Sequence, residues 1–198
     1  MLRGVKMNID FEYEKKFLDE YMESLKYFKP FLFRKMYRTG LLTSIIGKEL
    51  GIEDTEFYLA GFYANIGLMA VSKFVELPEN LTEEQVEQVK RHPVLGYEFL
   101  RKKGLENTAK YVYYHHELPD GSGYLGIDNY PVESAYINIA DTFEGLISPK
   151  PYRPPYTLTE ALNITLKLYK NGLKVEREAL STIENILRKF YDDMLQMY

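Results

Sequence analysis

The feature that most constrains the fold is the segment at residues 57–74, which is apolar on nearly every side and has Asn65 among its few polar positions. Asp54 and Thr55 precede it and offer side-chain oxygens of the kind that cap helix N-termini. A helix that is apolar on all sides is buried, because it has no polar face to expose to solvent. We therefore expect residues 57–74 to form a central helix around which the other elements pack.

The rest of the chain also has helical periodicity. Apolar and aromatic residues recur at helical spacing over residues 10–29, Pro30 interrupts them, and a second helix is expected over residues 33–50 with Gly51 as its cap. Further helices are predicted at residues 82–91, 93–100, 106–117 and 132–147, and in two segments that begin at the capping-box pattern from Thr157 to Glu160. No alternating strand pattern is longer than a few residues.

A chain of 198 residues is long enough to bury one substantial core. We predict an all-α protein, with a single helical domain at residues 31–198 and an N-terminal helical extension at residues 1–30. The formal net charge of −4 argues against general nucleic-acid binding but permits a local basic site for a small phosphorylated ligand. No segment reaches the roughly 18 apolar residues of a transmembrane helix, so no membrane span is expected.

The candidate metal ligands are histidines. The chain has no cysteine, which excludes thiolate ligands and is compatible with the cytoplasm, where we expect the protein to reside. Of its three histidines, His115 and His116 are adjacent and are followed by Glu117. Neutral imidazole is the commonest metal ligand among side chains, so this pair predicts part of a metal site. The alternative is a helix that happens to end in two histidines.

Two further features follow this pair in the sequence. A loop with Asp120, Gly121, Gly123 and Tyr124 follows it, and its glycines can adopt backbone angles that let a ligand approach closely. Helix 132–147 carries a polar row at intervals of three beside its core face, formed by Asn138, Asp141 and Glu144.

The order and spacing of these motifs resemble those of the HD-GYP domain, a helical member of the HD phosphohydrolase superfamily. The resemblance covers roughly residues 36–161 and rests on His92-Pro93 with Gly96, His115-His116-Glu117, Asp120-Gly121-Ser122-Gly123-Tyr124, Ala140-Asp141 and Pro151-Tyr152-Arg153. It implies hydrolysis of cyclic di-GMP with two or three iron, manganese or similar ions.

The same resemblance implies roles for individual residues. It places His92, His115, His116 and Asp141 at metal-ligand positions. It also places Lys150 and Arg153 near the phosphate of the substrate. For Arg153, a surface charge in a turn is an equally good interpretation.

The departures from the family pattern bear on activity. Where the family has His-Asp-x-Gly-Lys, this chain has Ala64-Asn65-Ile66-Gly67-Leu68. Ala64 has no ligand atom, Asn65 is a neutral and weaker ligand, and Leu68 replaces a lysine that is expected to contact phosphate. Two other departures lie elsewhere: where many members have another metal-binding histidine the chain offers only Lys35, Tyr37 and Arg38, and Leu125 replaces the proline after Gly-Tyr.

Three hypotheses follow. The first is a degenerate HD-GYP protein that has lost most or all hydrolysis and binds a cyclic dinucleotide, another small phosphorylated ligand or a protein partner. The second is an active phosphohydrolase with one divalent ion, such as Fe or Mn, held by His92, His115, His116 and Asp141. The third is an interaction module that holds no metal and whose histidines are relics. Whether the chain is an enzyme stays open at this stage.

Overall fold

The computed structural model describes residues 20, 22–71, 81–150, 153–172 and 174–195. These residues form helices and loops, and within them no strand is present beyond one isolated bridge, so the all-α prediction is confirmed. Residues 22–28 are helical, and the elements that follow are α2 (Pro30–Glu49), α3 (Thr55–Tyr63), the 3-10 helix η1 (Ile66–Val71), α5 (Glu83–Val89), α6 (His92–Arg101), α7 (Glu106–Tyr114), α8 (Val132–Ile147), α9 (Leu158–Leu166) and α10 (Arg177–Leu195). None of the described helices is long and apolar enough to cross a bilayer.

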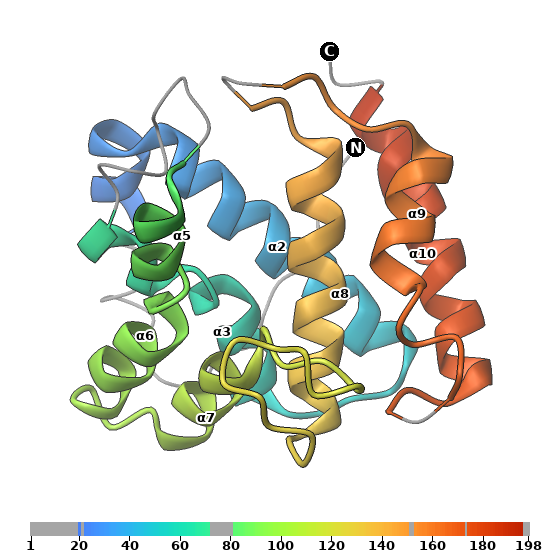
Figure 1. The fold of residues 1–198 in the computed structure, drawn as a ribbon, viewed down its shortest axis with the longest axis horizontal. Coiled ribbons are helices and arrows are strands. Elements are labelled where there is room, and N and C mark those ends of the chain that lie inside the picture. The colour runs from blue at the N-terminus through green and yellow to red at the C-terminus, as the bar shows by residue number, and fades with distance from the viewer. Residues whose placement is uncertain (1–19, 21, 72–80, 151–152, 173, 196–198) are drawn as a thin grey trace.

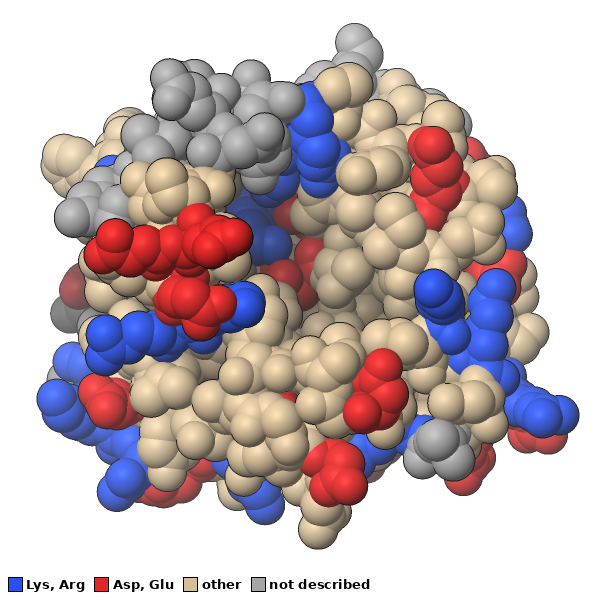
Figure 2. All heavy atoms as spheres, in the orientation of Figure 1, with Lys and Arg blue, Asp and Glu red and all other residues tan. Residues whose placement is uncertain are grey.

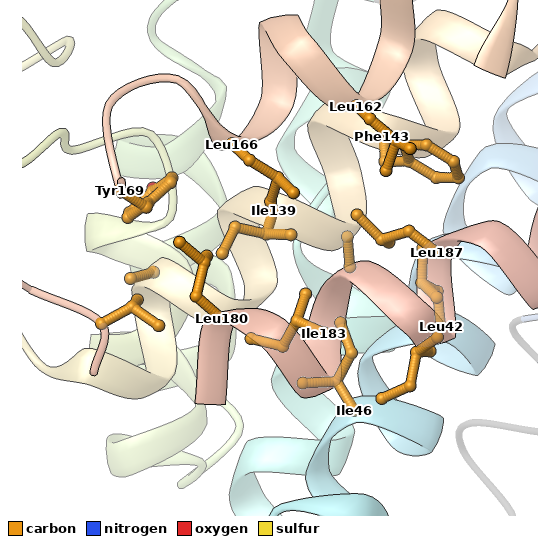
Figure 3. Packing of buried hydrophobic residues seen from close by; sticks show 14 of the residues in the cluster. Leu42, Ile46, Ile139, Phe143, Leu162, Leu166, Tyr169, Leu180, Ile183 and Leu187 are labelled. Carbon is orange, nitrogen blue, oxygen red and sulfur yellow. The ribbon is translucent and has the colours of Figure 1, made fainter. Parts of the chain in front are cut away.

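Helices α2 and α8 lie between two groups of helices, with α3, α5, α6 and α7 on one side and α9 and α10 on the other (Figure 1). Each group packs its own hydrophobic cluster against this central pair. The α9 and α10 side includes Leu42 of α2 and Ile139 of α8, as Figure 3 shows. The other side includes Met36 of α2 and Ile137 of α8. Helices α2 and α8 therefore contribute buried residues to both clusters.

Several helix ends follow directly from local sequence. Asp54 accepts a hydrogen bond from the Glu56 amide at 2.9 Å and so caps α3. Thr82 and Thr157 form the capping boxes of α5 and α9, as their spacing predicts. Pro30 occupies the first turn of α2, so this helix begins three residues earlier than expected. The part of the predicted first helix before residue 20 lies outside the described residues, and the division at residue 30 stays a prediction.

The prediction of one continuous helix over residues 57–74 is wrong. Helix α3 ends at Tyr63, and the chain turns before continuing as η1; residues 72–74 lie outside the described part. The turn lets η1 approach α6 so closely that a Cβ on Gly67 would lie 2.0 Å from the carbonyl oxygen of His92. It also points the Asn65 side chain at Asp141. These tertiary contacts outweigh helical continuity.

Candidate metal centre

Three histidines from two helix ends meet at one point. His92 is the first residue of α6, His115 is the C-cap of α7, and His116 follows it; α7 therefore ends earlier than the predicted residue 117. One ring nitrogen from each histidine lies within 4.8 Å of the other two. His92 and His115 are buried, whereas His116 is partly exposed. The spacing and exposure match what one metal ion with an open side would need.

Hydrogen bonds fix the protonation of two of these rings. Nδ1 of His92 lies 2.9 Å from the Val89 carbonyl oxygen, and Nδ1 of His115 lies 2.6 Å from the Val112 carbonyl oxygen. A carbonyl oxygen only accepts, so each Nδ1 carries the proton and donates it. In a neutral ring Nε2 is then an acceptor, and the two Nε2 atoms face each other at 3.2 Å. Two lone pairs at this separation repel unless a cation lies between them.

The rings are kept in the neutral, ligand form. Burial and the neighbouring His115 lower the pKa of His92 to about 3. Burial also lowers the pKa of His115. For His116, burial together with the other two histidines holds the pKa well below its usual value. All three rings are therefore available to a metal ion at neutral pH.

Asp141 lies next to this cluster, but one of its oxygens is already occupied. Its Oδ2 lies 3.9 Å from Nε2 of His116. Its Oδ1 accepts from Nζ of Lys35 at 2.8 Å, from Oγ1 of Thr39 at 3.2 Å and from the amide of Asn65. Burial acts to raise the pKa of Asp141, but the charge and hydrogen bond of Lys35, together with the neighbouring His116 and His115, outweigh burial and hold the pKa far below its usual value. Asp141 is therefore a fixed anion and a weak proton acceptor.

The three positions of the altered motif differ in their surroundings. Ala64 is fully buried and has no ligand atom. The Asn65 amide nitrogen faces Asp141, and its Oδ1 has no hydrogen-bond donor within the described residues. Leu68 is buried in the hydrophobic cluster of α3, α6 and α7, so its side chain belongs to the core.

The loop after the histidine pair is held by a buried carboxylate. Glu117, 1% exposed, accepts from the backbone amides of Leu125 at 2.8 Å and Ile127 at 2.6 Å. The loop folds back so tightly that a Cβ on Gly123 would lie 2.5 Å from Cα of Glu117. As a result, the Tyr124 ring stacks on His116 with 4.4 Å between centroids and 23° between planes. Sequence reasoning named Glu117 in the motif but missed this role.

The tip of this loop is shaped by local contacts. Oδ1 of Asp120 accepts from the amide and hydroxyl of Ser122 at 3.1 and 2.6 Å. Gly121 has a φ of 73°, in the left-handed region that favours glycine. Asp120 and Ser122 are exposed, and Tyr124 is 41% exposed. The loop therefore presents one face of the Tyr124 ring beside the histidines.

The two predicted phosphate contacts differ in their surroundings. Arg153 donates to the Gly145 carbonyl at 2.7 Å and the Leu146 carbonyl at 3.3 Å, which supports a role as a cap for the end of α8. The Lys150 side chain is half-buried, and its backbone pairs with that of Arg153. Burial and the nearby charge of Lys35 lower the pKa of Lys150. Contact of either residue with phosphate stays a prediction.

Lys35 is the member of the site that sequence reasoning missed. In the sequence, Lys35 stands out only because many members of the resembled family have a histidine near this position. In the structure, its Nζ is the cation nearest to Asp141 among the described residues. Its largely buried side chain extends from α2 toward α8, and its Nζ lies 4.0 Å from Oε2 of Glu144. Figure 2 shows a hollow over this region of the molecule, with basic and acidic side chains visible at depth.

Comparisons with known proteins find a matching domain family and related phosphodiesterases. The family model described as HD domain matches residues 23–175. The chain is 30% identical over 92% of its length to a cyclic di-GMP phosphodiesterase of Thermotoga maritima, covering 54% of that protein. It is 32% identical over 63% of its length to the cyclic di-GMP phosphodiesterase response regulator RpfG of Xanthomonas campestris, covering 36% of it.

The chain is also similar to a third phosphodiesterase in sequence and to one solved structure in fold. The 3'3'-cGAMP-specific phosphodiesterase 1 of Vibrio cholerae is 30% identical over 68% of the chain, which covers 33% of that protein. The chain thus spans about a third to a half of the length of these three relatives. The crystal structure of the HD domain of the L. monocytogenes phosphodiesterase PgpH matches with a TM-score of 0.68 at 15% identity, over 88% of this chain and 98% of that one. This likeness concerns the fold alone.

Proposed function

Because this chain belongs to the HD domain family and is related to cyclic di-GMP phosphodiesterases, we propose that it binds a cyclic dinucleotide beside one divalent ion, with hydrolysis lost or much reduced. His92, His115 and His116 would hold the ion, with Oδ2 of Asp141 at its edge. A bound divalent ion would supply a positive charge for the phosphate oxygens of the ligand. Lys35 and Tyr124 border the same space and offer a charge and an aromatic face.

The observation that carries this proposal is the environment of Asp141. Asn65 donates to this carboxylate instead of offering a second carboxylate to a metal. Three donors occupy Oδ1 of Asp141, and its pKa is held far below the usual value, so it cannot readily accept a proton from an attacking water. These contacts support binding over hydrolysis, because Asn65 offers no carboxylate to a second ion and Asp141 is a poor base.

A binding titration tests the proposal. Cyclic di-GMP titrated into the Mn²⁺-loaded protein should bind, and His115→Ala should weaken binding at least 10-fold, because it removes a ligand of the ion that holds the phosphate. Lys110→Ala, an exposed change on the same helix α7, is the matched control and should bind as the unaltered protein does. Equal binding by His115→Ala would contradict the proposed site.

Two other functions remain as alternatives. A phosphohydrolase with one metal ion is favoured by the open side that His116 gives the cluster. It predicts product formation that disappears in His115→Ala and in His116→Ala. A module that binds only a protein partner predicts that the purified protein holds no metal after incubation with Mn²⁺ or Fe²⁺.

A further inference from the structure

Two buried carboxylates face two basic residues across the α2–α8 contact. Asp141 and Glu144 lie one helical turn apart on α8, with 4% and 2% of their surfaces exposed. Lys35 of α2 lies 2.8 Å from Oδ1 of Asp141 and 4.0 Å from Oε2 of Glu144. Arg38, one turn further along α2, lies 3.9 Å from Oε1 of Glu144. The two negative charges are therefore balanced entirely within the protein.

Two side chains beside this contact have buried oxygen atoms without a hydrogen-bond donor. They are Glu144, whose Oε2 lies 4.0 Å from the Lys35 ammonium, and Asn65, whose amide nitrogen donates to Asp141 while its Oδ1 lacks a donor in the described part of the chain. Buried acceptors of this kind are unfavourable unless a cation or a donor compensates them. Carboxylate and amide oxygens are also the ligands that hard divalent cations prefer. Without the ammonium, Asp141 and Glu144 would be two buried carboxylates with no lysine charge beside them, and Oδ2 of Asp141 lies 3.9 Å from Nε2 of His116.

We propose that Lys35 is a built-in cation that takes the place of a second divalent ion. Its ammonium neutralises Asp141 and stands close to Glu144, which restricts the centre to one metal ion at the histidines. Removing the ammonium exposes Asp141, Glu144 and Oδ1 of Asn65 as a ligand set, and the protein then gains a second ion. The inference relies on the proposed function only for the ion at the histidines.

Charge balance explains why the ammonium and a second ion exclude each other. Histidine binds a metal as neutral imidazole, so one divalent ion held by the three histidines adds two positive charges beside Asp141. A second divalent ion would then lie next to both the first ion and the Lys35 ammonium, among largely buried side chains where like charges repel more strongly than in bulk water. Lys35→Ala removes one charge and opens the space that its side chain fills, so the balance shifts in favour of a second ion.

Counting bound ions tests the inference directly. Equilibrium dialysis against Mn²⁺, with metal analysis and electron paramagnetic resonance, should give one more ion per chain in Lys35→Ala than in the unaltered protein. The added ion should be coupled to the first, so that the six-line spectrum of isolated Mn²⁺ broadens. Lys35→Arg keeps the charge and should bind the same number of ions as the unaltered protein. Lys35→Ala/Asp141→Asn should lose the added ion.

The result that matters is the number of ions bound by the neutral Lys35 variants compared with the unaltered protein. Lys35→Gln provides a second neutral variant that keeps most of the side-chain volume, and circular dichroism identifies which variants are folded. No added ion in a folded neutral variant, or two ions in the unaltered protein, would overturn the inference. The proposed function fails separately, through the absence of cyclic di-GMP binding by the unaltered protein.

Discussion

Nε2 of His92 lies 3.2 Å from Nε2 of His115, while Nδ1 of each ring donates to a backbone carbonyl oxygen. Both facing nitrogens are therefore acceptors, and the pair is arranged to share a cation. The backbone of His115 is itself fixed, because its carbonyl accepts from the Asn138 amide at 2.8 Å. The centre is thus built into the ends of α6 and α7 and braced by α8.

Loss of one histidine should remove metal binding. His92→Gln keeps a polar side chain of similar size but no imidazole, so the Mn²⁺ affinity should fall by roughly 100-fold or more, since one of three ligands is lost. Isothermal titration with Mn²⁺ measures the change. Lys110→Ala on the exposed face of α7 should leave the affinity unchanged. An unaltered affinity in His92→Gln would mean that the ion binds elsewhere.

Glu117 should stabilise the protein through the loop that it holds. Glu117→Ala leaves two partly buried amides, those of Leu125 and Ile127, without their acceptor. We expect the free energy of unfolding to fall by about 2–4 kcal/mol, measured by urea denaturation. Asp120→Asn, a change at the exposed loop tip, should lower it by less than about 1 kcal/mol. Equal effects of the two changes would show that the loop is not anchored by Glu117.

The close approach of η1 to α6 should tolerate no side chain at residue 67. Gly67→Ala places a Cβ 2.0 Å from the His92 carbonyl oxygen, so the backbone must shift and stability should fall by about 3 kcal/mol or more. Gly145→Ala is the matched control within α8, where the nearest atom lies 3.8 Å from the added Cβ. It should be neutral or stabilising by up to about 1 kcal/mol. Thermal unfolding of both variants measures the contrast.

The buried histidines should make the metal-free protein sensitive to mild acid. The folded pKa of His92 is lowered to about 3, whereas an unfolded histidine titrates near pH 6.5. As the pH falls below about 6.5, His92 takes up a proton in the unfolded chain but not in the folded protein, so this residue alone decreases stability by up to about 1.4 kcal/mol per pH unit. The lowered pKa of Asp141 affects stability only at lower pH. Its stabilising contribution is complete above about pH 4 and is lost as the pH falls further.

Urea denaturation of the metal-free protein at about pH 7, 6 and 5 measures this dependence. The free energy of unfolding should decline across the series, and His92→Gln should reduce the slope. A constant stability from pH 7 to 5 would contradict burial of neutral histidines.

Local signals made much of the fold predictable. Side-chain oxygens at Asp54, Thr82 and Thr157 mark helix starts because the capping contact lies within three residues of the cap. The break between α3 and η1 was not predictable, because the local apolar pattern does not indicate the long-range contact between Gly67 and His92. Long-range packing therefore interrupts the segment, residues 57–74, whose sequence most strongly predicted one continuous helix.

The same distinction applies to the site. The histidine cluster could be predicted because the motifs are compact and their order resembles a known family. The pairing of Lys35 with Asp141 could not, because the two residues lie on helices α2 and α8, far apart in the chain. The sequence shows only that a lysine stands where a histidine could be expected. The contact of its charge with Asp141 forms when α2 and α8 pack together.

The most direct test of the account is chromatographic analysis of cyclic di-GMP after incubation with the Mn²⁺-loaded protein at a concentration where the titration shows it to be bound. We predict that the nucleotide is recovered intact, or is converted only slightly faster than with Mn²⁺ in buffer. Rapid conversion to the linear dinucleotide that is abolished by His115→Ala would contradict the account and would show that the histidine centre is an active hydrolase.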